Sequence, residues 1–503
     1  METQQHSHSL SQAAFRSFLG VSTPEWYKAM VIMFLVLNPA LLATGFSKFA
    51  VGWAIMAEFI VFLAGALKCY PLLPGGLLVM ESLVLGMGTV EGLYEEAHHN
   101  FPVILLLVFV VAGVAFLKDL LMFVFSKILT GIKSKSLLGL AFCMSGAVLS
   151  ANLDALTVIS IVITVFLALY KTYNDYRSRT EDGDDAELAQ FRSFLQSLSM
   201  QAAIGTMLGG VLTKVGEPQN LLIAHVMESA LPVEFAEDWT FVGFMVHMAP
   251  VTVPTLFAGM VLSVLVEKLR VFGYGAEMPV AIRTLLETNA KEESSTRTVD
   301  ETYKLAVQAV CAALLVTGLA THIAEVGILG LFLIVLTTVF NGVNDEHHIG
   351  QAFTFSLPFV ALLVVFFGIV DVIGHNQLFQ PVVEFALAQN AQGILLTFFA
   401  ASGALSSISD NVFVATVFIN EAKAAYDSGV ITAHEFEKLA IAINAGTNIL
   451  SIATPNGQAA FLFLLTSPLA AKIELGYGKM LYMALPFTVP LAIVSTTCVW
   501  LLL

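Results

Sequence analysis

The sequence predicts an all-α, polytopic membrane protein that is built from two related halves. Of its 503 residues, 57% are hydrophobic and only 12% are charged. A soluble chain of this length could not bury so much apolar surface, whereas a chain surrounded by lipid need not. Apolar runs of about 20 residues recur along the whole sequence, and each is long enough to cross a bilayer as a helix. The third observation is a polar segment that occurs twice inside apolar runs, around Asp154 and around Asp410.

The charged and sulfur-containing residues argue against several other classes of protein. The formal net charge is −15, and the acidic side chains gather in a few loops, such as Glu91–Glu96, so no basic patch is available to bind nucleic acid. The four cysteines are scattered and lack the spacing of a metal site or of an obvious disulfide pair. The sequence contains no nucleotide-binding loop and no nucleophile–base motif. We therefore expect neither an enzyme nor a protein with a bound cofactor.

The apolar runs divide the chain into predicted spans, and four of the runs contain an interruption. No small-residue cleavage site follows the first run, so we expect a retained span and not a signal peptide. The uninterrupted runs are Trp26–Thr44, Phe49–Leu67, Pro71–Val90, Phe101–Ser126, Val242–Val266, Leu305–Thr321, Val326–Phe340, Phe353–Val372 and Met480–Leu503. The interrupted runs are Leu137–Tyr170, Phe194–Ala230, Gly393–Asn420 and Phe436–Leu469.

Lysine and arginine residues assign the loops to the two sides of the membrane. The loops Lys127–Lys135, Lys171–Arg192 and Lys268–Lys304 are basic, which marks the cytoplasmic side. The loops Glu91–Asn100 and Leu231–Trp239 contain acids but no Lys or Arg, as expected outside. Counting along the chain then places the N-terminus in the cytoplasm and the C-terminus outside.

This orientation requires two of the interrupted runs to be re-entrant hairpins. Leu137–Tyr170 leaves one basic loop and returns to another, so it cannot cross the membrane once. Irregular backbone at membrane depth is tolerated where it lines a cavity, which favours a hairpin with Asp154 at its tip. By the same counting, Gly393–Asn420 enters from the outside. The two hairpins would then point at each other, as in inverted-repeat transporters, and about eleven transmembrane helices remain.

The other two interrupted runs are predicted to be broken helices. Each follows a hairpin, and Gly, Pro and amide residues break it over Gly209–Asn220 and Gly446–Gln458, with Pro218 aligned with Pro455. Proline removes an N–H donor and blocks the carbonyl one turn back. The freed carbonyls can ligate a cation, and the N-terminus of the second half-helix can face negative charge. Two such breaks indicate a central ion site.

We expect the repeat to divide the chain into five parts. The first and fourth parts are scaffold spans, the first of which also serves dimerisation, and the third is a cytoplasmic linker. The second and fifth parts are transport units with a hairpin and a broken helix. In order, the parts are residues 1–136, 137–267, 268–304, 305–392 and 393–503, the last of which includes the final span.

Asp154 and Asp410 are the residues on which we expect the ion site to centre. A carboxylate at membrane depth is costly, so it usually has a function. Sodium is a hard cation that prefers oxygen ligands. Burial favours the protonated form of a carboxyl group and a bound cation favours the ionised form, so one carboxylate holds either a proton or a sodium ion. This competition is the simplest exchange mechanism. The alternative is a buried aspartate whose oxygens are satisfied by N–H groups at a helix end.

Polar neighbours at the hairpin tips and helix breaks complete the expected site. Glu217 lies in the first break, where the second half has Thr454. Glu217 is either a third titrating group or the partner of Lys214, and the sequence leaves both interpretations open. Beside the two aspartates, the expected ion-binding residues are Ser150, Asn152, Gly216, Glu217, Ser406, Ser409, Asn411, Thr454 and Asn456.

Five segments carry a resemblance to a known family. They are Lys68-Cys69-Tyr70-Pro71-Leu72-Leu73-Pro74-Gly75-Gly76, Leu153-Asp154-Ala155-Leu156-Thr157-Val158, Val215-Gly216-Glu217-Pro218-Gln219-Asn220, Ser406-Ser407-Ile408-Ser409-Asp410-Asn411-Val412-Phe413-Val414 and Ala453-Thr454-Pro455-Asn456-Gly457-Gln458. Together they resemble the NhaB family of bacterial sodium/proton antiporters, over nearly the whole chain. The resemblance implies an electrogenic, alternating-access antiporter of the inner membrane that expels sodium, or lithium, in return for protons. Members of the wider ion transporter superfamily share the two hairpins and two broken helices and are often dimers, so a homodimer is implied.

Sodium-coupled dicarboxylate carriers of the same superfamily supply the main alternative function. They resemble this chain at Gly209-Gly210 and at Gly216-x-Pro218-x-Asn220. They typically have a neutral Ser-Asn-Thr at each hairpin tip, where this chain has Asp154 and Asp410. A fixed carboxylate repels an anionic substrate and suits a cation. The sequence therefore favours sodium/proton antiport over sodium-coupled uptake of a small organic anion.

Overall fold

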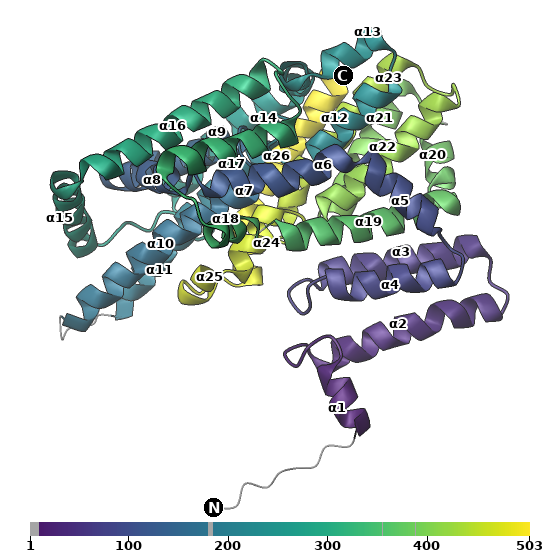
Figure 1. The fold of residues 1–503 in the computed structure, drawn as a ribbon, viewed down its shortest axis with the longest axis horizontal. Helices are drawn as coiled ribbons and strands as arrows, with labels where there is room; N and C mark the ends of the chain where they lie inside the picture. Colours follow the sequence, from purple (N-terminus) through teal and green to yellow (C-terminus); the bar gives the residue numbers. More distant parts are fainter. Residues whose placement is uncertain (1–9, 180–184, 355, 388) are drawn as a thin grey trace, which may run out of the picture. The chain divides into compact units, whose positions relative to one another are not determined.

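The computed structural model describes residues 10–179, 185–354, 356–387 and 389–503, and in these ranges all regular structure is helical (Figure 1). The predicted all-α fold is confirmed, whereas Met1, expected in the cytoplasm, lies outside the described residues. The chain packs into two compact units, Met1–His99 with Ala361–Pro381, and Asn100–Val360 with Val382–Leu503. We call them the N-terminal unit and the main unit and describe each by itself. This division follows packing, so the predicted boundaries of the five parts stay a prediction.

The N-terminal unit is a helical bundle that packs through aromatic and small residues. Its helices are α1 (Leu10–Ser17), α2 (Glu25–Ala43), α3 (Lys48–Ala64), α4 (Leu72–Val84), α5 (Val90–His99) and most of α19 (Leu357–His375). Phe59 of α3 lies edge-on to Phe366 of α19, with ring centroids 5.8 Å apart. A methyl group at Gly75 of α4 would collide with the Phe59 ring, so this glycine lets the two helices approach closely.

The first half of the main unit contains a hairpin, a broken helix and a long helix in that order. The hairpin is α9 and α10, the broken helix is α11 and α12, and the long helix is α14. The elements are α6 (Phe101–Leu105), η1 (Leu106–Val110), α7 (Val111–Ala115), α8 (Lys118–Gly131), α9 (Lys135–Ser150), α10 (Ala155–Arg179), α11 (Asp185–Gly210), α12 (Pro218–Ala230), α13 (Val233–Ala236), η2 (Glu237–Trp239), α14 (Phe241–Leu269) and α15 (Val280–Thr296).

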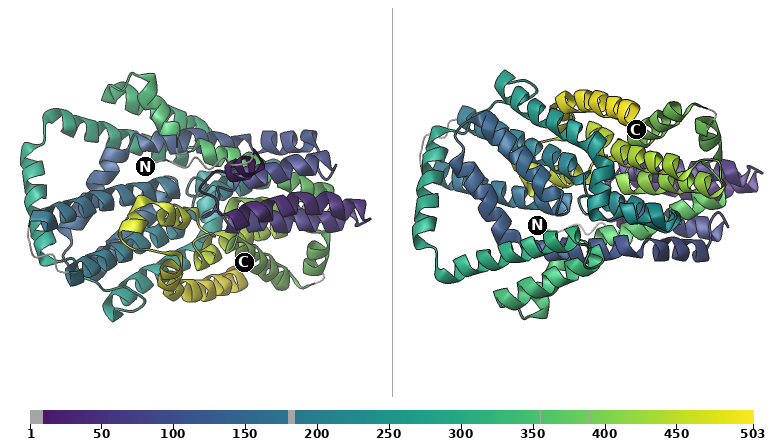
Figure 2. Two further views of the ribbon diagram at one scale, coloured as in Figure 1. Left: turned by 90° about the horizontal axis from the view of Figure 1, so that it is seen from below. Right: turned by 90° about the horizontal axis from the view of Figure 1, so that it is seen from above.

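The second half repeats this order with α21 and α22, then α23 and α24, then α26. Both long helices even contain two prolines four residues apart, Pro250 and Pro254 in α14 and Pro486 and Pro490 in α26. These two helices pack along each other, as can be followed in Figure 2. The elements are α16 (Val299–Ala320), α17 (Val326–Asn341), α18 (Glu346–Phe353), α20 (Gln380–Leu387), α21 (Ala391–Ser406), α22 (Asn411–Asp427), α23 (Ala433–Ile449), η3 (Leu450–Ala453), α24 (Ala459–Thr466), α25 (Pro468–Lys472) and α26 (Tyr477–Leu502).

In each half, the first arm of the hairpin packs backbone to backbone against the first part of the broken helix. In the first half this pair is α9 and α11, and in the second half it is α21 and α23. A methyl group on Gly209 would overlap the carbonyl oxygen of Ala147, and one on Gly446 would overlap that of Phe399. Small residues allow such close approach between helices in a membrane, where packing replaces the hydrophobic effect as the driving force. Each hairpin is thereby held against its broken helix.

The predicted span Phe101–Ser126 differs from the structure, which ends one helical segment at Ala115 and begins α8 at Lys118. The new start has its own cap, because the side chain of Gln308 from α16 accepts a hydrogen bond from Leu120 N at 2.8 Å. Gln308 Nε2 also donates to Asp119 Oδ2 at 3.3 Å. Asp119 lies in the first turn of α8, where a negative charge is favourable. A contact from a distant helix thus divides the run at its two charged residues, Lys118 and Asp119.

The helix lengths are those of a membrane protein with partial spans. Within the described residues, six helices are long and apolar enough to cross a membrane, namely α2, α10, α14, α16, α19 and α26. The first hairpin arms, α9 and α21, have 16 residues each. Such a helix extends about 24 Å, less than the ~30 Å hydrocarbon core. This length suits a re-entrant arm, but the count of about eleven spans and the entry from opposite faces stay predictions.

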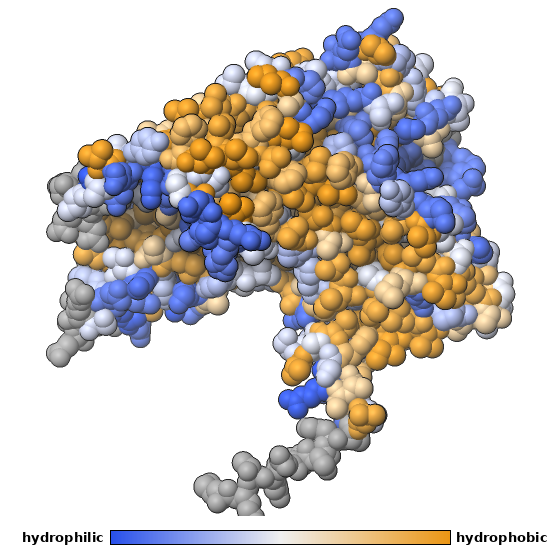
Figure 3. All heavy atoms as spheres, in the orientation of Figure 1, coloured by the Kyte–Doolittle hydropathy of each residue, from blue (hydrophilic) through white to orange (hydrophobic). Residues whose placement is uncertain are grey.

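Apolar side chains also cover part of the main unit's outer surface. In Figure 3 they gather over α16 and α17. Val310 and Leu314 of α16 and Phe332, Val335 and Val339 of α17 are all exposed. An exposed apolar surface of this kind is expected where helices face lipid chains.

Candidate ion-binding site

Asp154 and Asp410 occupy equivalent positions, immediately before the second helix of each hairpin. Asp154 Oδ2 accepts a hydrogen bond from Thr157 N at 3.2 Å. Asp410 Oδ1 accepts from Val412 N at 2.8 Å and from Phe413 N at 3.3 Å. Each aspartate is therefore an N-cap, as the alternative interpretation of the sequence expected. The capping hydrogen bonds are accepted by Oδ2 of Asp154 and by Oδ1 of Asp410. Capping is therefore compatible with a cation bound at the same carboxylate.

Glu217 brings the two aspartates into a single electrostatic environment. Its side chain is 1% exposed and interacts electrostatically with both Asp154 and Asp410. Its Oε1 has no hydrogen-bond partner among the described residues. The interpretation that pairs Glu217 with Lys214 is wrong, because Lys214 Nζ forms an ion pair with Glu228. Carboxyl groups from both halves thus influence one another electrostatically, and the described residues show no basic partner for Glu217.

Ser150 and Gly216 lie beside Glu217. A methyl group built on Gly210 would lie 3.0 Å from Ser150 Oγ, 3.1 Å from Gly216 O and 3.2 Å from Glu217 Cγ, so all three line one small region. Ser150 Oγ is buried and, like Glu217 Oε1, has no hydrogen-bond partner in the described part of the chain. Buried polar atoms rarely lack a hydrogen-bond partner. The presence of Ser150 Oγ and Glu217 Oε1 without one in the same small region therefore indicates a site for a ligand.

Other predicted ligands fasten the hairpin tips to the helix breaks. The hydroxyl of Thr454 donates to Ser407 O, and the hydroxyl of Ser406 donates to Thr447 O at 3.0 Å. In the first half, Thr213 Oγ1 donates to Ala151 O at 2.5 Å. Threonine therefore ties the tip to the break in both halves.

The remaining predicted residues differ in how far they are engaged. Ser409 Oγ donates to Leu405 O at 2.7 Å, and Asn152 Nδ2 donates to Val148 O at 2.9 Å, so both bind the helix that precedes them. Asn411 is buried beside Asp410, and its Nδ2 has no partner in the described residues. Asn456 is half-buried in the second break.

The carbonyls freed at each break are satisfied by an amide side chain from the start of the following half-helix. Asn220 Nδ2 donates to Gly210 O at 2.7 Å and to Thr213 O at 2.6 Å. Gln458 Nε2 donates to Asn448 O at 3.0 Å and to Ser451 Oγ at 2.9 Å. Because water is scarce at membrane depth, such internal partners are what make a broken helix tolerable.

Amide side chains also join the two halves at their breaks. Gln219 Nε2 donates to Asn448 Oδ1 at 2.9 Å, and Asn448 Nδ2 donates to Asn220 Oδ1 at 3.1 Å. None of these three amides, Gln219, Asn220 and Asn448, is among the ion-binding residues predicted from the sequence. Their position next to a Gly–Pro break in an apolar helix could have indicated them, because a fully buried amide must find a hydrogen-bond partner.

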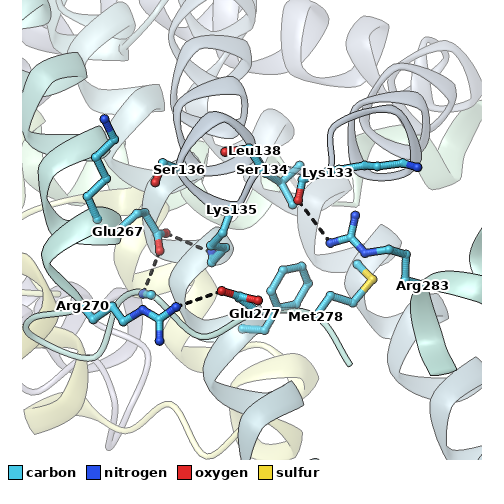
Figure 4. Close-up of a pocket in the computed structure, with 13 residues that line it drawn as sticks. Lys133, Ser134, Lys135, Ser136, Leu138, Glu267, Arg270, Glu277, Met278 and Arg283 are labelled. Carbon is cyan, nitrogen blue, oxygen red and sulfur yellow. Dashed lines mark hydrogen bonds and ion pairs between the residues drawn. The ribbon is translucent and has the colours of Figure 1, made fainter. Parts of the chain in front are cut away.

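A separate polar pocket of ≈ 340 Å³ lies at the beginning of α9 and the end of α14 (Figure 4). There Lys135 Nζ forms an ion pair with Glu267 Oε1 at 3.0 Å, and Gly275 N donates to Glu267 Oε2 at 2.8 Å. Arg270 pairs with Glu277 at 2.9 Å across the same pocket. The pocket is lined by none of the predicted ion-binding residues, and its contacts tie the connector after α14 to the first hairpin arm.

Comparison with known proteins identifies the family. The family model for bacterial Na+/H+ antiporter B (NhaB) matches residues 7–503. A Na(+)/H(+) antiporter NhaB of Escherichia coli is 52% identical, covering 98% of this chain and 96% of the relative, and one of Shigella flexneri is 51% identical with the same coverage. Among solved structures, one similar chain is MtrF of Neisseria gonorrhoeae, which is described with a class of antimetabolite efflux pumps. Its TM-score is 0.50 at 13% identity, covering 84% of both chains, so the similarity is one of fold alone. The chain belongs to the NhaB family of bacterial Na+/H+ antiporters.

Proposed function

We propose that this protein is a secondary active antiporter of the bacterial inner membrane that expels Na+ from the cytoplasm in exchange for H+. Membership of a family of transporters supports this activity. The structural observation that supports the proposal best is that buried Glu217 interacts electrostatically with an aspartate from each half, Asp154 and Asp410. Clustered carboxylates attract a cation and repel an anion, which disfavours sodium-coupled uptake of a dicarboxylate.

The proposed mechanism is competition between Na+ and H+ for the carboxyl groups. A sodium ion neutralises the clustered charge and takes oxygen ligands from the hairpin tips and breaks. Protons neutralise the same charge when the ion has left, so the two cargoes alternate at one site. The halves would rock about this site to open it to either side, and unequal charge transfer would make the cycle electrogenic. The cytoplasmic N-terminus, the periplasmic C-terminus and the homodimer belong to this proposal.

Inverted membrane vesicles provide the test of the activity. An acridine dye reports an acidic interior, and adding Na+ is expected to release protons and restore its fluorescence, whereas choline chloride is expected to have no effect. Vesicles without the protein serve as the background. Uptake of labelled succinate driven by Na+, without any Na+-dependent proton release, would reject antiport in favour of anion symport.

Asn411→Ala is expected to weaken apparent Na+ affinity about tenfold, the loss of about 1.4 kcal/mol of binding. Asn411 Nδ2 is buried and has no hydrogen-bond partner among the described residues. Rotation of the amide by half a turn would place Oδ1 at this position, where it can bind a cation beside Asp410. Asn152→Ala is expected to have a smaller effect, because that amide already donates to Val148 O. The KM for Na+ in proteoliposomes measures both, with exposed Asn174→Ala as the control. An unchanged KM in both variants would remove these amides from the list of ligands.

Glu217→Gln is expected to impair exchange strongly at every pH, because glutamine retains the size of the side chain but cannot take up or release a proton. Glu437→Gln is a matched control in the same unit, since Glu437 is also buried and accepts a hydrogen bond from Trp239 Nε1 at 3.3 Å, which glutamine can preserve. Proton flux in proteoliposomes is the measurement. If both variants exchange equally well, Glu217 carries no proton.

A further inference from the structure

The N-terminal unit contains a buried polar cluster that the exchange mechanism does not use. Asn38 of α2, Glu58 of α3 and Glu81 of α4 meet where these three helices pack together. Asn38 Nδ2 donates to Glu58 Oε2 at 2.8 Å and to Glu81 Oε2 at 2.9 Å. Asn38 is 0% exposed and Glu58 is 4% exposed, while Glu81 is half-buried. One amide nitrogen therefore bridges two carboxyl groups in the interior of the bundle.

Two ionised carboxylates are not a stable arrangement at this place. Both oxygens lie within hydrogen-bond distance of the same nitrogen, so their charges would repel each other across a short distance in a medium of low dielectric constant. Neither glutamate forms an ion pair with a lysine or arginine within the described ranges. The neutral amide offers only its two N–H groups. A further positive charge is required to balance the pair.

The unbonded atoms of the cluster show which kind of group is absent. Asn38 Oδ1 and Glu58 Oε1 are both buried and have no hydrogen-bond partner among the described residues. Both atoms are acceptors, so the cluster lacks a donor. A proton on either carboxyl group supplies an O–H donor and removes one of the two charges at the same time. A single proton thus removes the repulsion between the two carboxylates and supplies the missing hydrogen-bond donor.

We propose that Glu58 and Glu81 form a second proton-binding site, in which the two glutamates share a single proton and Asn38 holds them together. The site belongs to α2, α3 and α4 and contains none of the proposed ion-binding residues. It binds a proton of its own, in addition to those exchanged for Na+. Loss of this proton places a second negative charge in the bundle, so the packing of the three helices is linked to pH.

Infrared difference spectroscopy between acidic and alkaline pH tests the proposal on the full-length protein. The Asp154→Asn/Asp410→Asn variant is the parent, because it removes the central aspartates from the carboxyl region of the spectrum. Glu58→Gln and Glu81→Gln are each expected to move the pH midpoint of the same protonated-carboxyl band to a lower pH, since the remaining glutamate has no like-charged neighbour. The double variant is expected to lose this band. Exposed Glu91→Gln is the control and should match the parent.

The effect of each variant on the same band distinguishes a shared proton from two independent ones. Two different bands, each lost in one single variant and unmoved in the other, would overturn the proposal, as would a spectrum unchanged in both single variants. If Glu58→Gln does not insert into the membrane, Glu81→Gln carries the test alone, because its half-buried side chain tolerates the change more easily. An unchanged band in that variant would also reject the shared proton.

Discussion

Asp154→Asn and Asp410→Asn are each expected to reduce Na+/H+ exchange to the level of empty vesicles while the protein remains folded and inserted. Asparagine is nearly isosteric with aspartate and is as good an N-cap. Its side-chain oxygen can still accept from Thr157 N in the first hairpin and from Val412 N in the second. It cannot take up a proton near neutral pH, so proton-coupled turnover is lost although the fold is kept. Transport across pH in proteoliposomes matched for protein content measures the effect.

A third aspartate provides a control for the capping role. Asp345 is the N-cap of α18 and accepts a hydrogen bond from His348 N at 2.9 Å, but it is exposed and outside the proposed site. Asp345→Asn is therefore expected to leave exchange near normal. Asp→Glu at Asp154 and Asp410 keeps the carboxylate but lengthens the side chain, whereas Asp→Asn keeps the length but removes the charge. The Asp→Glu variants should therefore retain more activity if the charge of the side chain matters more than its length. Near-normal exchange in the Asp154→Asn/Asp410→Asn double variant would mean that protons travel elsewhere, with Glu217 as the next candidate.

Gly209→Ala is expected to prevent most of the protein from folding. The added methyl group would overlap the carbonyl oxygen of Ala147, and its nearest neighbours are backbone atoms, which cannot move aside as a side chain can. Overpacking usually costs about 1–3 kcal/mol and sometimes more, and here it separates α9 from α11. The yield of monodisperse protein and its melting temperature in detergent measure the effect.

The control for this change is Gly131→Ala, at the end of α8. A methyl group at Gly131 meets no heavy atom within 4 Å, so this variant is expected to behave like the unmodified protein. The comparison separates overlap from the general effect of replacing glycine in a helix. A Gly209→Ala protein that melts and exchanges normally would show that the first hairpin arm does not pack on the broken helix as described.

The sequence by itself determined where the two hairpins and the two broken helices of the main unit are interrupted. Asp154 and Asp410 each lie directly before a helix, Pro218 is the first residue of α12, and Pro455 lies in the gap between η3 and α24. These signals are local, because proline cannot donate a hydrogen bond within a helix but suits its first position, and aspartate is a good N-cap. The long apolar runs likewise indicated a membrane protein without any knowledge of contacts.

Only the tertiary structure decided which side chains meet. Lys214 has Glu217 three residues away in the sequence but pairs with Glu228, fourteen residues away, and Glu217 instead interacts electrostatically with Asp154 and Asp410. Gln308 starts a new helix at Lys118 from a distant position in the chain. The sequence indicates that a buried polar group needs a partner, but the choice among partners depends on how helices far apart in the chain approach one another, which no local pattern encodes.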